Sequence, residues 1–317
     1  MSAATSADFL WSASGAVVVN PASAGGATAR RWPGLRQALV QRGLRFQTLF
    51  TERGGQAGEL ARQAVESGAR WILFVGGDGT FNEAINGLAD ESGRVPDSVA
   101  LGFIPSGTGL DLARNLGLPL DCRKAVQVLG ARVRRVDLGQ VCWENGTRRL
   151  FANMGGAGFD GEVATRAIPW RRYLPGKLSY AMGIVTTLPG YRERAMELRL
   201  ETDGPPLRLE LRAKMVVASN GHSFGGGMRL TPRAAIDDGL LDVFILGAVP
   251  PLEFLARMPS VYQGTHLDHP HPEVQVIRAR RVEVRADPDI RVQTDGEPAG
   301  MLPATFDVIS AAVSVLT

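Results

Sequence analysis

The chain has 317 residues, 44% of them hydrophobic, and a formal net charge of only +3 at pH 7, a composition typical of a globular protein. Two cysteines in a chain of this length argue against a disulfide scaffold and suit a reducing compartment. No apolar run reaches the roughly 18 residues of a membrane span, and the opening MSAATSADFLWSASG lacks the regions of a secretory signal. These features predict a cytoplasmic protein.

The first third of the chain alternates strand patterns with helix patterns joined by short links. The strand runs are nearly continuous apolar segments, as expected for a sheet buried on both faces. Such alternation predicts a parallel sheet covered by helices. The expected strands lie at 15–23, 45–51, 70–77 and 99–107, and the expected helices at 29–43, 58–68, 80–90 and 110–117.

The pattern changes after about Val136, where apolar and polar residues alternate around two-residue turns. Asn145-Gly146 and Asp203-Gly204 are typical hairpin turns, and residues 280–300 repeat the pattern. A basic helical segment near 162–195 interrupts the strands. We therefore predict an α/β domain at 1–139 followed by a mostly β domain at 140–302.

Glycine-rich segments invite nucleotide-binding interpretations, and two common ones fit poorly. A P-loop needs a lysine after its last glycine, and none of the three lysines stands in that position. Residues 156–161, GAGFDG, match the dinucleotide pattern G-x-G-x-x-G. The match lies in the β-rich half and lacks the acidic residue expected about 20 residues later.

The segment VGGDGTFNE at 75–83 follows a buried strand pattern and precedes a helix pattern. Glycines let backbone N–H groups approach phosphate oxygens closely, and Thr80 can cap the helix. A carboxylate beside a phosphate repels it unless Mg²⁺ or a ribose hydroxyl lies between them. Asp78 therefore predicts a magnesium–nucleotide site without a P-loop lysine.

A second glycine-rich turn, PSGTGLDLARNLG at 105–117, follows the next strand pattern. It supplies Thr108, Gly109 and Asp111. Because ligands bind beyond the carboxyl ends of parallel strands, we expect both turns to contribute to one site.

The motifs in this order resemble the diacylglycerol kinase catalytic-domain family, which includes bacterial lipid kinases and the sphingosine and ceramide kinases. The resemblance runs almost end to end. It rests on VNPAS, GGDGTFNE, GTGLDLARNLGLP, VDLGQV…RLFANMGGAGFDGEV, ASNGHSFGGGMRLTPRAAIDDGLLDV and TDGEP.

The resemblance implies an NAD-kinase-like nucleotide-binding α/β domain and a β-rich lipid-binding domain, with the active site in the cleft between them. It also implies that 303–317 returns to the first domain. The implied activity is transfer of the ATP γ-phosphate to a lipid hydroxyl, of diacylglycerol or a sphingoid-type lipid, with Mg²⁺. The implied partner is a lipid substrate at a membrane surface, reached by peripheral contact, and not a nucleic acid.

Site residues follow from the resemblance by position. Glu297 would accept the proton of the lipid hydroxyl, with Asp295 as close support. Asp78 and Asp111 would organise the phosphates and Mg²⁺. Asp238 and the carbonyls of Ala235 and Leu240 would form a second, structural metal site. The implied nucleotide contacts are Asn20, Pro21, Thr51, Gly76, Gly77, Asp78, Gly79, Thr80, Asn82, Glu83, Gly107, Thr108 and Asp111.

One departure from the family pattern keeps alternatives open. Leu110 stands where the family usually has Asn before Asp111, so an amide near the nucleotide is lost. A weakly active or non-catalytic lipid-binding regulatory protein therefore remains an alternative, as does an NAD-kinase-like small-molecule kinase, which shares the GGDG loop.

Two further segments are candidates for binding. His266, His269 and His271 lie within six residues and could bind zinc, although the neighbouring prolines indicate an irregular loop. Residues 165–183 mix cations with aromatic and apolar side chains, as an interfacial helix would. The sheet edges of the second domain could also pair in a homodimer.

Overall fold

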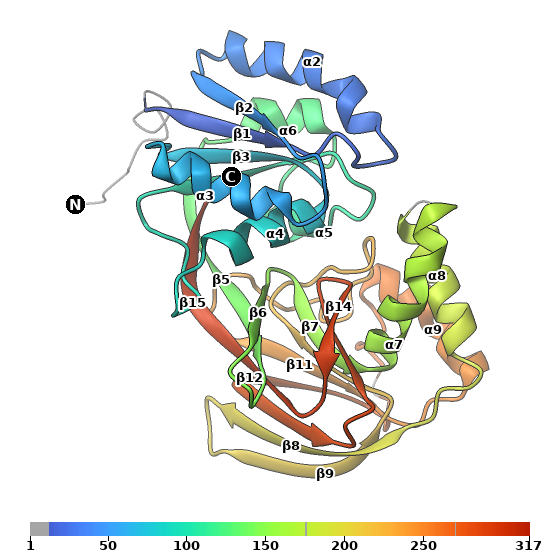
Figure 1. Cartoon of the computed structure of the whole chain (residues 1–317). Coiled ribbons are helices and arrows are strands. Elements are labelled where there is room, and N and C mark those ends of the chain that lie inside the picture. The colour runs from blue at the N-terminus through green and yellow to red at the C-terminus, as the bar shows by residue number, and fades with distance from the viewer. Residues whose placement is uncertain (1–12, 175, 270) are drawn as a thin grey trace. The chain divides into compact units, whose positions relative to one another are not determined.

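The computed structural model describes residues 13–174, 176–269 and 271–317, so the interpretation of the first twelve residues lies outside it. The chain divides into two compact units, one formed by Met1–Val136 with Ala311–Thr317 and the other by Asp137–Ser310 (Figure 1). It passes from one unit to the other within strands β5 and β15.

The first unit contains the predicted parallel sheet, in the order β4-β3-β1-β2. The last residues of β15 add a further parallel strand, with Val315 opposite Leu101. Every residue of β1, β3 and β4 is buried, as expected for a sheet covered on both faces. The strands are β1 (Gly15–Val19), β2 (Phe46–Phe50), β3 (Trp71–Gly76), β4 (Ala100–Pro105) and β15 (Ala304–Leu316).

Helices cover both faces of this sheet. On one face Trp32, Leu35 and Val126 join a cluster with alternate residues of the strands. On the other, the Phe81 ring packs edge-on against Phe74 at 6.0 Å between ring centroids. The helices are α2 (Ala27–Gln41), α3 (Gln56–Glu66), α4 (Asp78–Leu88), α5 (Asp111–Asn115) and α6 (Cys122–Val128), of which only α6 was not expected.

The second unit is antiparallel, in the order β14-β13-β7-β10-β11-β12-β15, with β8 and β9 added beyond β12. The predicted turns at Asn145-Gly146 and Asp203-Gly204 join β5 to β6 and β8 to β9. The strands are β5 (Val133–Cys142), β6 (Arg148–Phe151), β7 (Met154–Gly158), β8 (Arg194–Thr202), β9 (Leu207–Ala213), β10 (Met215–Ser219), β11 (Leu241–Leu246), β12 (Val274–Ala286), β13 (Arg291–Thr294) and β14 (Glu297–Met301).

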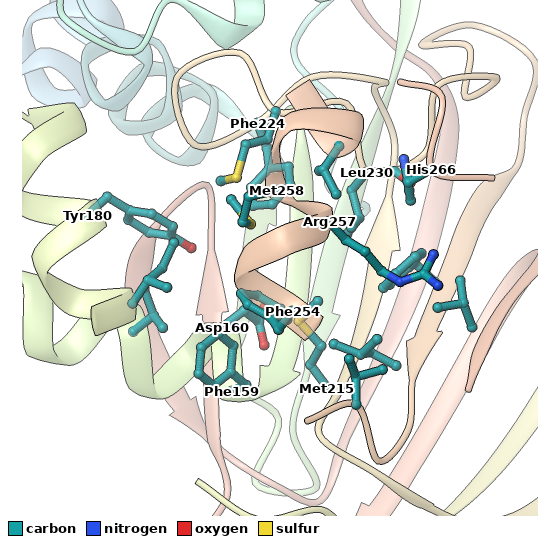
Figure 2. Close-up of a pocket in the computed structure, with 18 residues that line it drawn as sticks. Phe159, Asp160, Tyr180, Met215, Phe224, Leu230, Phe254, Arg257, Met258 and His266 are labelled. Carbon is teal, nitrogen blue, oxygen red and sulfur yellow. The ribbon is translucent and has the colours of Figure 1, made fainter. Parts of the chain in front are cut away.

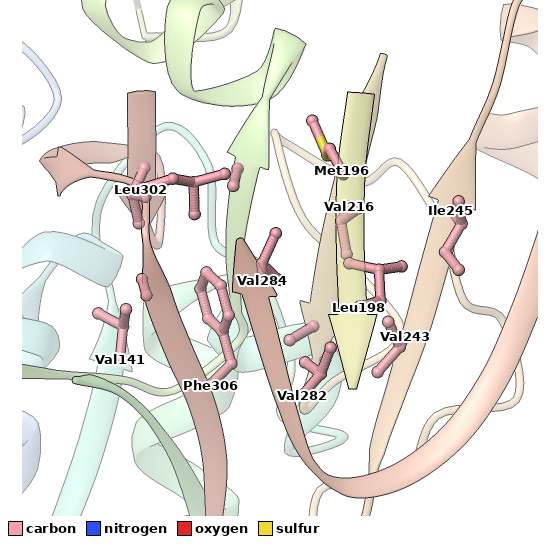
Figure 3. Packing of buried hydrophobic residues seen from close by; sticks show 14 of the residues in the cluster. Val141, Met196, Leu198, Val216, Val243, Ile245, Val282, Val284, Leu302 and Phe306 are labelled. Carbon is pink, nitrogen blue, oxygen red and sulfur yellow. The ribbon is translucent and has the colours of Figure 1, made fainter. Parts of the chain in front are cut away.

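One hydrophobic core of this unit lies between its strands (Figure 3). Leu198, Val284 and Phe306 are almost fully buried there. The Phe306 ring packs against Phe151, with ring centroids 6.5 Å apart. The β12 strand pairs with β15 and β8, and its register against β8 shifts between Ala279 and Arg281. Such a shift bends the strand and lets it curve around the core.

A second apolar cluster lies under the helices of this unit. The predicted helical segment near 162–195 is confirmed in α7, η1 and α8, but its last residues, Arg194 and Ala195, belong to strand β8. The α9 helix was not expected, and none of its residues is buried. Among the described residues, no helix is both long and apolar enough to span a membrane. The helices are α7 (Phe159–Ala167), the 3-10 helix η1 (Ile168–Arg172), α8 (Gly176–Thr187) and α9 (Pro251–Gln263).

Candidate functional site

Loops at the carboxyl ends of the parallel strands are tied together by hydrogen bonds. The Asn20 backbone N–H donates to the Val75 carbonyl at 2.9 Å, and its Nδ2 donates to Thr80 Oγ1 at 3.1 Å. The Ser106 N–H donates to the Gly76 carbonyl at 2.8 Å. The loops after β1, β3 and β4 therefore form one rim along the edge where a parallel sheet binds ligands.

Glycines allow the two predicted phosphate loops to touch. A Cβ added to Gly107 would lie 2.5 Å from the Gly77 Cα, closer than real Cβ atoms approach. A Cβ on Gly109 would lie 2.7 Å from Asp78 Oδ2. The backbone of the second loop can approach the first only because side chains are absent at these positions.

Asp78 joins these loops through its carboxylate. Its Oδ1 accepts the Leu112 N–H at 2.8 Å, in the first turn of α5. Burial raises the pKa of Asp78, and backbone hydrogen bonds from Leu112, Asp111 and Leu110 oppose that rise. Asp111 is also buried, and its Oδ1 pairs with Arg114 Nη1 at 3.1 Å. Two carboxylates thus stand at the rim, as the sequence predicted.

Leu110 has φ 61° and ψ 32°, in the left-handed region where asparagine and glycine are favoured. An asparagine would suit this backbone better than leucine does. Beside it lies a cavity of about 400 Å³. The cavity is lined by Arg31, Pro105, Gly107, Leu110, Leu120, Asp121, Cys122 and Arg123.

Two of the predicted nucleotide contacts have other partners. Glu83 Oε2 accepts the Ala57 N–H at 3.2 Å, at the start of α3. Asn82 is buried and accepts a hydrogen bond from Asn86. Gly79 and Thr108 are exposed, whereas Thr51, Thr80 and Gly76 are buried and Pro21 and Gly77 are partly buried.

The residues at the rim fit a magnesium ion. Mg²⁺ prefers oxygen ligands, and a partly buried carboxylate such as Asp78 gains from a cation nearby. The second predicted metal site fits less well, because Asp238 Oδ2 already pairs with Arg278 and Oδ1 accepts the Leu240 N–H. Among the described residues, no group of three or more His, Cys, Asp or Glu is arranged for a metal, either at the rim or at Asp238. The site at Ala235, Asp238 and Leu240 stays a prediction.

The TDGEP segment forms the β13–β14 turn in the second unit. Asp295 lies at its first position with φ 48°. Its carboxylate accepts the backbone N–H groups of Ala152, Asn153 and Met154 at 2.8, 2.9 and 3.1 Å. Asp295 therefore anchors the turn to the bend between β6 and β7, and its oxygens are engaged by the backbone.

Glu297 follows the same turn, and its side chain has a different environment. Its Oε1 accepts a hydrogen bond from Arg171 Nη1 at 2.7 Å, and Arg171 Nη2 donates to the Gly296 carbonyl at 2.9 Å. The side chains of Arg171 and Glu297 are 38% and 42% exposed. Glu297 is thus an accessible carboxylate held at the tip of a rigid turn.

A buried polar chain leads from this turn into the unit. The Gly296 N–H donates to Gln293 Oε1 at 2.8 Å, and Gln293 Nε2 donates to Asp160 Oδ2 at 2.9 Å. Asp160 Oδ1 has no hydrogen-bond partner in the described structure. Burial raises the pKa of Asp160 to about 6, although the bond from Gln293 opposes the rise.

Asp160 lines an apolar pocket between α8 and α9 (Figure 2). Aromatic and aliphatic side chains from both helices and from the sheet form its walls. Its volume is about 80 Å³, below the roughly 300 Å³ of ordinary ligand pockets. Lining residues include Phe159, Tyr180, Ile184, Phe244, Phe254 and Met258.

Sequence reasoning gave no role in the reaction to Arg171, Gln293 or Asp160. Arg171 and Glu297 are 126 residues apart in sequence, so no local pattern could have paired them. The histidines of 266–271 do not converge on one point. His266 Nε2 bonds to the Leu230 carbonyl at 2.9 Å, and His271 Nε2 to Glu253 Oε1 at 3.1 Å.

Family models match both halves of the chain. Residues 14–141 match the diacylglycerol kinase catalytic domain, and residues 154–317 match the YegS C-terminal NAD kinase beta sandwich-like domain. Both matches agree with an α/β unit followed by a β-sandwich-like unit, so the predicted fold class is confirmed.

Relatives cover nearly the full chain. A diacylglycerol kinase of Mycobacterium tuberculosis is 32% identical over 303 residues, covering 94% of this chain and 93% of its own. One from Bacillus subtilis is 31% identical over 292 residues, covering 92% and 91%. The crystal structure of a diacylglycerol kinase from Bacillus anthracis has a TM-score of 0.69 and 22% identity, over 95% of both chains. At that identity the structural likeness shows the fold alone.

Proposed function

Because this chain belongs to the diacylglycerol kinase family, a family of lipid kinases, we propose that it transfers the γ-phosphate of ATP to the hydroxyl of a lipid, with Mg²⁺. The acceptor that the relatives' names suggest is diacylglycerol. Sphingoid-type lipids are the other acceptors that the resemblance allows.

The loops of the first unit support the nucleotide part of this proposal. Phosphoryl transfer depends mainly on positioning and on neutralising charge. Backbone N–H groups of the glycine loops would bind the phosphates, and Asp78 and Asp111 would hold Mg²⁺. When bound, the ion would neutralise charge that develops on the transferred group.

Glu297 supports the part of the proposal that concerns the lipid acceptor. As the lipid oxygen bonds to the γ-phosphorus, the bond from that phosphorus to the β,γ-bridging oxygen breaks and ADP leaves. The proton of the lipid hydroxyl passes to a Glu297 carboxylate oxygen. Asp295 acts here as a positioning residue, since its oxygens are occupied by three backbone N–H groups.

The apolar pocket is the observation that carries the choice of a lipid over a small polar acceptor. Its walls are apolar and aromatic, and Asp160 supplies a polar group among them. A pocket of about 80 Å³ cannot take an acyl chain without movement of its walls. The α9 helix has no buried residue, so its displacement would disrupt little packing. We propose that lipid chains enter here as α8 and α9 separate.

The test is phosphorylation of a lipid panel with Mg²⁺–ATP, with products identified by mass spectrometry. Asp78→Asn keeps an oxygen for the Leu112 N–H but loses the charge, so we expect a fall of at least about 100-fold in turnover with an unchanged melting temperature. Phosphorylation of NAD instead of any lipid would favour a small-molecule kinase. ATP-independent lipid binding without turnover would favour a regulatory protein.

We also propose that the protein works in the cytoplasm and meets its substrate by peripheral contact with a membrane. Residues 165–183, the predicted docking segment, correspond to η1, most of α8 and the end of α7. Ile168, Tyr173 and Leu178 there are 47%, 74% and 55% exposed. Sedimentation with lipid vesicles tests this contact directly.

A further inference from the structure

Arg171 connects the predicted docking segment to the turn that carries Glu297. It makes a two-point contact, with one nitrogen on the Glu297 carboxylate and another on the Gly296 carbonyl. The residue that we propose as the proton acceptor is therefore engaged by a cation of η1. While this ion pair is intact, Glu297 Oε1 is occupied by the Arg171 guanidinium and is not available to a lipid hydroxyl.

The surface around Arg171 has the composition of a membrane-binding segment. Ile168, Tyr173 and Leu178 are large and exposed, and Arg172 and Lys177 are exposed cations between them. The Arg172 guanidinium lies 5.8 Å from the centre of the Tyr173 ring. Apolar and aromatic side chains interleaved with cations fit the interface of a bilayer that carries anionic lipids. We name these five residues the docking face.

We propose that the docking face binds an anionic bilayer surface and that lipid phosphates then draw Arg171 away from Glu297, which frees the carboxylate for catalysis. This inference rests on the proposed function, because it assigns a regulation to the same site. In this proposal Arg171 is a positioning residue, because its release from Glu297 couples membrane binding to the state of the β13–β14 turn.

Arg171 can exchange the Glu297 carboxylate for a lipid phosphate because it binds neither of them strongly enough to exclude the other. Exposed ion pairs contribute little to stability, and this pair is about two-fifths exposed on each side. A guanidinium binds phosphate with the same two-point geometry that it uses with a carboxylate. A bilayer offers many phosphates close to η1, whereas the turn offers one carboxylate.

The experiment compares vesicles of phosphatidylcholine with vesicles that also contain phosphatidylglycerol, each holding the same fraction of dioleoylglycerol. For the wild type we expect phosphatidylglycerol to raise kcat severalfold, beyond its effect on the vesicle concentration at half-maximal rate. Arg171→Met should show the raised kcat on both vesicle types. Arg172→Met is the matched control, since it removes a neighbouring cation that does not contact Glu297. It should need more vesicles and keep the rise in kcat at saturation.

Two results would overturn the inference while leaving the proposed function intact. One is a full rise in kcat with phosphatidylglycerol in Arg171→Met, and the other is loss of turnover by this variant on both surfaces. Arg171→Lys keeps the charge without the two-point contact. If Arg171→Met unfolds, this second variant decides, and it should show a smaller rise than the wild type. A wild type that phosphorylates no lipid would contradict the proposed function and this inference with it.

Discussion

Asp295 and Glu297 are two residues apart on one turn, yet their different hydrogen-bond partners give them different roles. The Asp295 carboxylate accepts three backbone N–H groups, while the Glu297 carboxylate is accessible and pairs with Arg171. The sequence suggested that both carboxylates act in the reaction. The hydrogen bonds indicate that one builds the turn and the other faces the solvent.

This division predicts opposite effects of two substitutions. Asp295→Ala would leave backbone N–H groups without partners, and we expect it to lower the free energy of unfolding by about 2 to 4 kcal/mol. Glu297→Gln should change it by less than about 0.5 kcal/mol and should abolish turnover. Urea unfolding and kinase assays of both variants check the pair. Equal destabilisation by both substitutions would contradict the division.

Asp160 predicts a pH dependence of stability. Its pKa is about 6 in the folded chain, raised by burial from an ordinary value of 3.8. The folded state thus binds this proton more tightly than the unfolded state, and its stabilising contribution is lost as the pH rises from about 4 to above 6. Relative to the wild type, Asp160→Asn should gain about 2 to 3 kcal/mol of stability between pH 4 and pH 7.

Chemical denaturation across that pH range measures the effect. Asp203→Asn is the control, because the Asp203 side chain is 57% exposed. A difference between Asp160→Asn and the wild type that does not change with pH would show that Asp160 is not held near its raised pKa.

Among the described α-helices of the second unit, α9 is the least buried. None of its residues is buried, whereas all six residues of β11 are. Its apolar contact with the unit runs through the pocket, where the Phe254 ring lies 5.4 Å from that of Phe159. The helix is therefore a cover over the pocket that packs on the apolar cluster from outside, with Phe254 partly buried against it.

Hydrogen exchange tests this description of α9. Amides of Pro251–Gln263 should exchange faster than those of Leu241–Leu246, because opening the helix exposes little apolar surface. Dioleoylglycerol in vesicles should slow the exchange of α9 if the lipid enters the pocket. The α7 helix, with six buried residues, is the control and should exchange slowly in both conditions. Equal protection of α9 and β11 without lipid would contradict the interpretation.

Elements with strong local signals were predictable from the sequence. The continuous apolar run of β3, the glycine turn after it and the Asn-Gly and Asp-Gly hairpins each depend on neighbouring residues alone. The α9 helix carries a proline at 259, which argues against a helix in the sequence, and its role as a cover depends on distant partners. The Arg171–Glu297 pair and the Gln293–Asp160 bond likewise join segments that only the fold brings together.

The two compact units are built from different numbers of chain segments. The second is one continuous segment, Asp137–Ser310, whereas the first needs Ala311–Thr317 to complete it. Val313, Val315 and Leu316 are fully buried in the first unit. The end of the chain is therefore a structural part of the first unit.

Removing Ala311–Thr317 should accordingly unfold the first unit while the second stays folded. Loss of three buried apolar side chains costs about 5 kcal/mol, a large part of the stability of an ordinary domain. Limited proteolysis followed by mass spectrometry should find cleavage within 13–136 and a resistant fragment over 137–310. Leu316→Ala, expected to cost about 2 to 5 kcal/mol, gives the graded version. Resistance of both regions in the truncated chain would refute the assignment.

The contact between Gly77 and Gly107 has a consequence for how this protein can evolve. A Cβ on Gly107 would clash with the Gly77 backbone, so a side chain added to the second loop would displace the first. A backbone clash cannot be relieved by choosing another rotamer, and the two loops cannot drift independently. We expect descendants of this gene to diverge in helices and surface strands long before Gly107 is replaced.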